Sequence, residues 1–140
     1  MIIKNNNFSI NVDVENTKEY SRTHSLCTCN EDQNFYIQVE KKLPNLSKFL
    51  MAFGLYINRP DEIASHQENN DIHYDFVSYT IIGEILNAEK YELTFNDDNY
   101  NLEIIMDKRY IPNEQKTKNY FTITIYNIIF PYILKEKPFS

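Results

Sequence analysis

Two helices are predicted over residues 30–43 and 45–53, where apolar side chains recur every three or four positions. These apolar positions are Phe35, Val39 and Leu43, then Leu46, Phe49, Leu50 and Phe53. Asn30 has a suitable side chain to cap the first helix. Pro44 separates the two helices because its ring disfavours helix at the preceding residue. Gly54 suits the left-handed position that ends the second helix.

Most of the remaining chain alternates apolar and polar residues, as half-buried strands do. The expected strands cover residues 8–14, 63–68, 71–85, 90–95, 100–106 and 120–126. Gly83 indicates a bulge near the end of the longest strand. Residues 128–134 are apolar but contain Pro131, so they form either a strand end or a C-terminal turn. The polar range 17–22 is ambiguous and fits a helical turn, and 112–118 is expected to be a loop.

These elements predict an α+β fold. Two helices with one apolar face each need a surface to cover, and the strands supply it as a sheet. We therefore expect an antiparallel sheet of about five to seven strands, with the two N-terminal helices packed on one face. A chain of 140 residues is long enough to bury a core and is expected to form one domain, residues 1–140.

The formal net charge of −6 is unevenly distributed. Residues 61–103 contain eleven Asp or Glu and one Lys, whereas ranges 1–60 and 104–140 are weakly positive. Such a segment repels nucleic acid and suits a basic protein partner. The residues predicted to bind this partner are Asp71, Asp75, Glu84, Glu89 and Glu92. The alternative is a merely solvated sheet face, and Asp97 and Asp98 are expected to be solvated in a turn.

The sequence favours a cytoplasmic protein without a membrane partner. Residues 1–9 contain two Ile and a run of Asn, and they lack the apolar core of a signal peptide. No stretch reaches the roughly eighteen apolar residues of a spanning helix, and two cysteines are too few for a disulfide framework. Abundant Asn and Ile are typical of a low-GC bacterium. The eleven Tyr and nine Phe are compatible with a homodimer.

The strongest chemical motif is the spacing His24-x2-Cys27-x-Cys29. Zinc prefers four ligands in a tetrahedron, often nitrogen and sulfur, and these three residues could supply three of them. The fourth ligand would be Asp32, His66, His73 or a residue of a second subunit. The alternatives are two thiols that bind no metal, or a reactive thiol near a helix N-terminus.

No catalytic residue is assigned. A cysteine, a histidine and a carboxylate could be combined into a nucleophilic site, but no spacing requires it. Only two glycines occur in the chain, which leaves no glycine-rich phosphate loop or dinucleotide fingerprint. An enzyme is therefore less favoured than a binding protein, and zinc is the one cofactor considered.

The chain resembles a family of small uncharacterised proteins of Firmicutes with the pattern H-S-L-C-x-C-x2-C-x-N-[FY]. Here the pattern reads His24-Ser25-Leu26-Cys27-Thr28-Cys29 and then Asn34-Phe35. Asp32 stands at the position of the third cysteine, so metal or thiol chemistry would not carry over unchanged. The family has no established activity, and the resemblance implies no reaction.

Two hypotheses of function follow. The first is a small protein-binding module, most concretely an immunity-type protein that neutralises a toxin by covering its active site with an acidic face. The second is a metal-binding or thiol-dependent protein centred on His24, Cys27 and Cys29. A structural or oligomeric protein without either site is the third reading.

Overall fold

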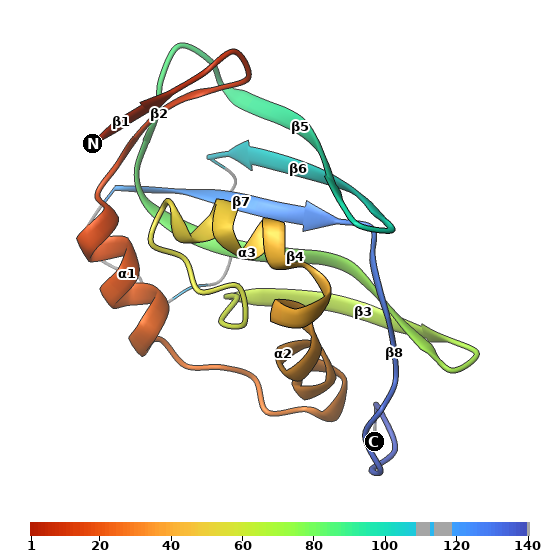
Figure 1. The fold of residues 1–140 in the computed structure, drawn as a ribbon. Helices are drawn as coiled ribbons and strands as arrows, with labels where there is room; N and C mark the ends of the chain where they lie inside the picture. Colours follow the sequence, from red (N-terminus) through yellow and green to blue (C-terminus); the bar gives the residue numbers. More distant parts are fainter. Residues whose placement is uncertain (109–112, 114–118, 140) are drawn as a thin grey trace.

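The computed structural model describes residues 1–108, 113 and 119–139, and these form three helices and eight strands in an α+β fold, as predicted (Figure 1). The helices are α1 (Val14–Thr23), α2 (Asn30–Lys42) and α3 (Pro44–Met51). The strands are β1 (Ile2–Lys4), β2 (Ser9–Val12), β3 (Glu62–Glu68), β4 (Asp71–Ile85), β5 (Lys90–Asp97), β6 (Tyr100–Asp107), β7 (Tyr120–Tyr126) and β8 (Ile128–Pro131). In the described part of the chain, no helix is long and apolar enough to cross a membrane.

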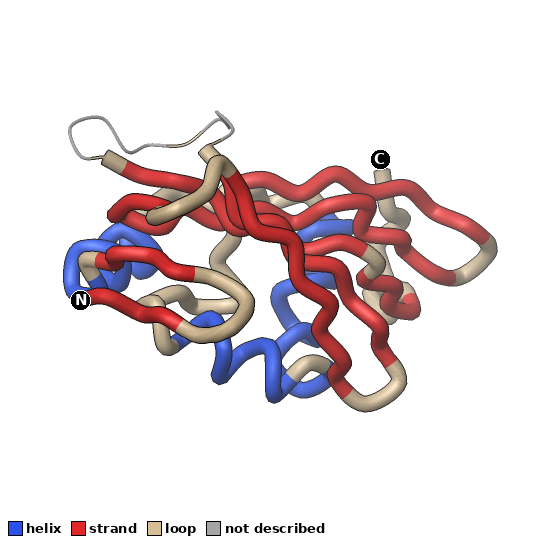
Figure 2. The backbone as a smooth tube through the Cα atoms, turned by 90° about the horizontal axis from the view of Figure 1, so that it is seen from above, coloured by secondary structure: helices blue, strands red, loops and turns tan. Residues whose placement is uncertain are grey.

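All strand pairs are antiparallel, and β4 is the centre of the sheet. The strands follow the order β1-β2-β4-β7-β6-β5, and β3 and β8 also pair with β4. One edge of β4 therefore carries β3 and then β2, while the other carries β8 and then β7. The three helices lie on one side of this curved sheet (Figure 2).

Several boundaries differ from the sequence predictions. Residues 8–14 do not form one strand, because β2 ends at Val12 and Asp13 caps α1 by accepting the N–H of Asn16. The range 17–22 belongs to α1, a third helix. Asn30 is the first helical residue of α2 and not its cap, since Cys29 occupies the cap position. Within the described residues the sheet has eight strands, one more than the upper end of the expected range. The predicted loop 112–118 lies outside these residues except for position 113.

The core lies between the helices and the inner face of the sheet. The predicted helical stripes are buried except for the half-buried Phe49, and they pack against alternating residues of the central strands. The inward strand residues include Val77, Tyr79, Ile81, Leu102, Ile104, Met106, Ile123 and Ile125. Phe35 packs near Tyr74 and Phe130 through ring contacts. The predicted core function of both helices is therefore confirmed.

The two glycines occupy positions where a side chain would not fit. Gly54 follows α3 with a φ of +93°, which confirms the predicted left-handed position. Gly83 has a φ of +151°, and a Cβ there would lie 2.0 Å from the carbonyl oxygen of Asn11 on β2. Gly83 therefore permits close approach of β2 to β4.

Two buried polar residues form hydrogen bonds between elements that are far apart in the sequence. Asp97 contacts α3, and Asn34 contacts β8. The buried Asp97 accepts the N–H groups of Asn45 and Leu46 at 2.9 and 2.8 Å, so a residue of β5 caps α3. The expectation that Asp97 is solvated is wrong. Asn34 of α2 is also buried, and its amide group donates to the carbonyl oxygen of Pro131 at 3.1 Å.

Candidate functional site

Four groups of polar residues are candidates for function. The first is a set of carboxylates on the sheet, and the register of the strands shows which face they share. Residues directly opposite each other on paired strands share a face. The face away from the helices carries, by this register, the carboxylates of Glu62, Glu68, Asp71, Asp75, Glu84, Glu92, Glu103 and Asp107. We call this outer surface of β3 to β6 the acidic face. Lys90 is the only Lys or Arg between residues 61 and 107, and it pairs with Glu92 at 3.1 Å.

The structure places four of the five predicted partner-binding residues on the acidic face. Asp71, Asp75, Glu84 and Glu92 are exposed there, whereas Glu89 is exposed in the loop before β5. They do not form one compact group. Asp71 and Asp75 lie at one end of β4 and Glu84 lies at the other, so the acidic face extends along the length of that strand.

The middle of the acidic face is less polar than its margins. Phe76, Ile105 and Tyr126 are half-buried there, and they are not among the residues packed against the helix-side core. Ser78 and Thr124 lie beside Ile105 on the same face; both are fully buried, and their hydroxyl oxygens lie 2.9 Å apart. The face therefore combines an aromatic and aliphatic centre with a charged margin.

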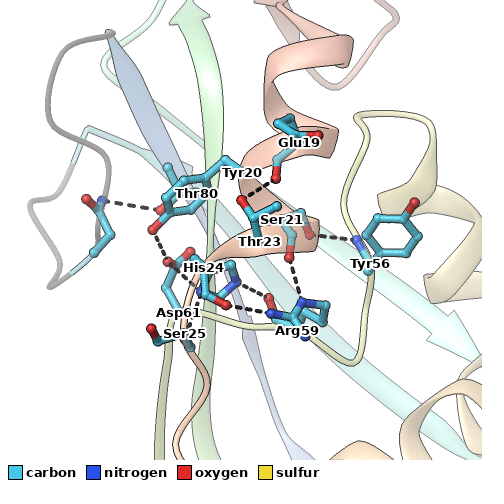
Figure 3. A network of polar contacts seen from close by, with 11 residues as sticks. Glu19, Tyr20, Ser21, Thr23, His24, Ser25, Tyr56, Arg59, Asp61 and Thr80 are labelled. Carbon is cyan, nitrogen blue, oxygen red and sulfur yellow. Dashed lines mark hydrogen bonds and ion pairs between the residues drawn. The ribbon is translucent and has the colours of Figure 1, made fainter.

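The second group surrounds His24, which is buried (Figure 3). Its Nε2 lies 2.9 Å from the carbonyl oxygen of Arg59, and its Nδ1 lies 3.0 Å from that of Ser25. Both ring nitrogens therefore face backbone carbonyl oxygens, which only accept hydrogen bonds. The Asp61 carboxylate lies 3.7 Å from Nδ1.

Asp61 is the second ionisable residue of this group. Burial raises the pKa of its carboxyl group, and the hydrogen bond from Tyr20 and the nearby His24 oppose the rise. The hydroxyl of Tyr20 donates to Asp61 at 2.5 Å. Asp61 also accepts hydrogen bonds from the backbone and side chain of Thr80.

These contacts supply hydrogen-bond partners to a segment of β4 that lies between its pairings with β3 and β2. The pairing of β3 with β4 ends at Ser78, and that of β2 begins at Gly83. Among the described residues, no strand pairs with this edge of β4 between those two positions. Along this stretch of β4, Asp61 accepts the hydrogen bonds of Thr80. The hydroxyl oxygen of Thr17 in α1 accepts the N–H of Ile82 at 3.0 Å. The group around His24 is therefore structural.

The third group contains the two cysteines and Asp32, and it differs from the predicted metal site because His24 is not part of it. The sulfur atoms of Cys27 and Cys29 lie 3.0 Å apart, and one ligand atom from each of the three residues lies within 4.8 Å of the others. Cys29 is the cap residue of α2 and Asp32 is its third residue, which brings their side chains together. His24 does not join this cluster, because both ring nitrogens face backbone carbonyls.

We call Cys27, Cys29 and Asp32 the cysteine cluster. Its members Cys27 and Asp32 line a small surface hollow of about 170 Å³, which Glu62 also lines. Burial raises the pKa of the Cys29 thiol and that of the Asp32 carboxyl group. Hydrogen bonds from the two thiols lower the pKa of Asp32 in part. Two sulfur atoms and one carboxylate are ligands that zinc accepts.

The fourth group lies on the hairpin of β3 and β4. His66 and His73 stand directly opposite each other, and their rings stack with centroids 4.9 Å apart. Glu68 Oε2 lies 2.9 Å from His66 Nε2 and 3.2 Å from His73 Nε2. Asp75 Oδ2 lies 2.8 Å from His66 Nδ1. We call these four residues the hairpin cluster.

Sequence reasoning named His66 and His73 only as partners for the cysteines, and the structure does not bring them there. The signal for the hairpin cluster is the spacing H-x-E-x4-H-x-D across the turn at Asn69 and Asn70. Residues two apart on a strand share a face. Such a hairpin therefore gathers all four side chains, and this could have been inferred from the predicted turn.

Comparisons of the chain with protein families, with curated proteins and with solved structures find no match. The resemblance to a family of small Firmicutes proteins therefore stays a prediction.

Proposed function

We propose that this protein is a protein-binding module whose acidic face docks a basic protein. The observation that carries the proposal is the concentration of eight carboxylates and one lysine, Lys90, among the outward residues of β3 to β7, on the face away from the described helices. A surface of one charge steers an oppositely charged partner and excludes wrong ones. Two copies of this face would repel each other, so the proposed partner is a different, basic protein.

The half-buried residues at the centre of the acidic face support docking over simple solvation. Stable interfaces have aromatic and apolar centres with polar margins. Phe76, Ile105 and Tyr126 supply such a centre, and Glu62 and Glu103 flank it on neighbouring strands. An immunity-type protein that covers the basic active site of a toxin would use such a surface, and this is the partner class that we propose.

Three uncharged substitutions on the acidic face test the proposal. We expect Glu84→Gln, Glu92→Gln and Glu103→Gln together to lower the association rate with the basic partner about tenfold at low ionic strength. High salt should reduce the difference, because it screens exposed charges. The partner is first recovered on immobilised protein and identified, and the rates are then measured with both components purified.

The matched control removes three exposed carboxylates on the helix side, through Glu15→Gln, Glu19→Gln and Glu40→Gln. Both triple variants change the net charge equally. The control should leave the association rate within about twofold of wild type, since it does not alter the acidic face. Equal losses in both variants would assign binding to net charge alone, and no loss in the first would contradict the proposal.

A second candidate function is zinc binding at the cysteine cluster, which the approach of two sulfur atoms and Asp32 favours. Without metal, we expect iodoacetamide to modify Cys27 faster than Cys29. Cys27 is exposed, whereas burial raises the pKa of the Cys29 thiol and keeps it protonated. Added zinc should slow alkylation of both residues, because it binds the thiolates.

The readout for this second candidate is the mass of each modified peptide over time. Asp32→Asn is the matched variant, because it keeps the shape of the side chain and removes a charged ligand. It should weaken protection by zinc. Alkylation that zinc does not slow would contradict metal binding at the cysteine cluster, and the binding of a basic protein would be unaffected by that result.

A further inference from the structure

We propose that the hairpin cluster is a second, separate metal site, which binds a divalent transition-metal ion of the zinc class. His66 Nε2, His73 Nε2 and Glu68 Oε2 would be its protein ligands. The site is distinct from the cysteine cluster and does not depend on the proposed protein partner.

The local fold explains why these ligands converge. The hairpin turn joins β3 to β4 in a register that sets His66 opposite His73 and Glu68 opposite Asp71. The two histidines point to the same side of the sheet, and their stacked rings are inclined by only 20°. Both Nε2 atoms thereby face one oxygen of Glu68.

The two separations from Glu68 are close to the edge lengths of a tetrahedral site, and all three ligand atoms lie within 4.8 Å of one another. Zinc is bound by histidine nitrogen and carboxylate oxygen at about 2.0–2.1 Å, and a tetrahedron of this radius has edges of about 3.3–3.4 Å. The observed separations from Glu68 Oε2 to His66 Nε2 and His73 Nε2 are 2.9 and 3.2 Å. Small side-chain rotations would therefore admit the ion, which would replace the hydrogens now shared between these atoms.

Asp75 supplies the outer contact that metal-binding histidines usually have. A ligating histidine commonly donates its other N–H to a carboxylate, which fixes the ring and raises the basicity of the ligating nitrogen. The 2.8 Å contact from His66 Nδ1 to Asp75 Oδ2 has this arrangement. Asp75 lies at a β-bulge, since Ala64 pairs with Phe76 and Ser65 with Tyr74. The bulge turns its side chain toward His66.

The ligand set also defines the class of ion. Two imidazoles and a carboxylate suit zinc, copper or nickel, whereas magnesium and calcium prefer oxygen ligands alone. The side chains of His66 and Glu68 are about half exposed, at 48% and 57%, and that of His73 is 27% exposed. An ion could therefore enter directly from solvent, and its fourth position would be open to water or to a ligand from another molecule.

Zinc titration followed by NMR of the histidine ring protons tests this site. We expect the signals of His66 and His73 to shift together and to saturate at one zinc per chain. His24 provides an internal control within the same protein, because both its ring nitrogens are engaged with backbone carbonyls. Its signals should not move. Repeating the titration in a double variant, Cys27→Ser and Cys29→Ser, distinguishes zinc bound at the hairpin cluster from zinc bound at the cysteine cluster.

Three variants distinguish a metal site from a simple ion pair. Glu68→Gln should abolish the joint shift of the two histidines, and Asp75→Asn should weaken zinc binding about 10–100-fold through the lost orienting contact. Asp71→Asn is the control on the same hairpin, and it should leave affinity within about threefold. All three positions are exposed, so the fold should persist, and the backbone NMR spectrum verifies this.

Two outcomes would overturn the inference. One is a zinc titration in which only one histidine shifts, or in which neither saturates. The other is a loss of affinity in Asp71→Asn as large as that in Asp75→Asn, which would indicate general attraction to negative charge. Neither outcome bears on docking of a basic protein, which is measured with Glu84, Glu92 and Glu103.

Discussion

Replacing Asp97 with Ala is expected to lower the free energy of unfolding by about 3 kcal/mol. The Asp97 carboxylate is fully buried and accepts the first N–H groups of α3. The cap residue of α3, Leu43, has no side-chain group that could replace it. The substitution would leave buried N–H groups without a partner at the positive end of the helix dipole.

The neighbouring residue provides the control for this result. Asp98 is exposed in the turn with a φ of +50°, a conformation that Asn tolerates. Asp98→Asn should change stability by less than about 0.5 kcal/mol. Asp97→Asn keeps an acceptor oxygen without the charge and should fall between the two. Urea denaturation measures all three, and similar midpoints for the Asp97→Ala and Asp98→Asn variants would contradict the capping role.

Gly83→Ala is expected to cost about 3 kcal/mol or more. The φ of +151° is strained for any residue with a Cβ, and the added carbon would lie 2.0 Å from a backbone oxygen of Asn11. Neither backbone can move without breaking the pairing of β2 with β4. Thermal unfolding measures the total loss of stability.

Hydrogen exchange identifies which strands lose amide protection first in the Gly83→Ala variant. Because the clash lies between β2 and β4, amides of residues 2–12 should lose protection before those of β7. Glu84→Ala is the matched control, since Glu84 is the next residue and is exposed on the acidic face. It should change stability by less than about 0.5 kcal/mol. A tolerated alanine at position 83 would show that β2 is not held closely against β4.

The elements with strong periodicity could be predicted, and those held by polar contacts could not. Helices α2 and α3 have continuous apolar stripes. Helix α1 buries Thr17 and Ser21 instead, so its sequence has no apolar stripe to detect. The three-residue β1 is too short and exposed for an alternation to be visible.

The candidate sites show the same limit. His24 is close to the cysteines in the sequence, which suggested that they share a metal. In the structure its Nε2 instead contacts the carbonyl oxygen of Arg59, 35 residues away. Asp97 looked solvated because its partner amides are about fifty residues distant. Local spacing does place Cys29 beside Asp32, because a helix start fixes that distance. The spacing of residues in the sequence therefore predicts contacts within one element. The direction of a side chain also depends on backbone groups that are distant in the sequence.

The position of β4 among four partner strands has a consequence for assembly. Its segment from Val77 to Ile82 is uncharged and rich in β-forming residues, and in the folded protein β7 covers one edge of it. Until β7 pairs, that edge presents free N–H and C=O groups to any other chain. Partly folded molecules should therefore associate through β4. Refolding yield should fall steeply as protein concentration rises, although the folded protein presents a negatively charged surface that resists association.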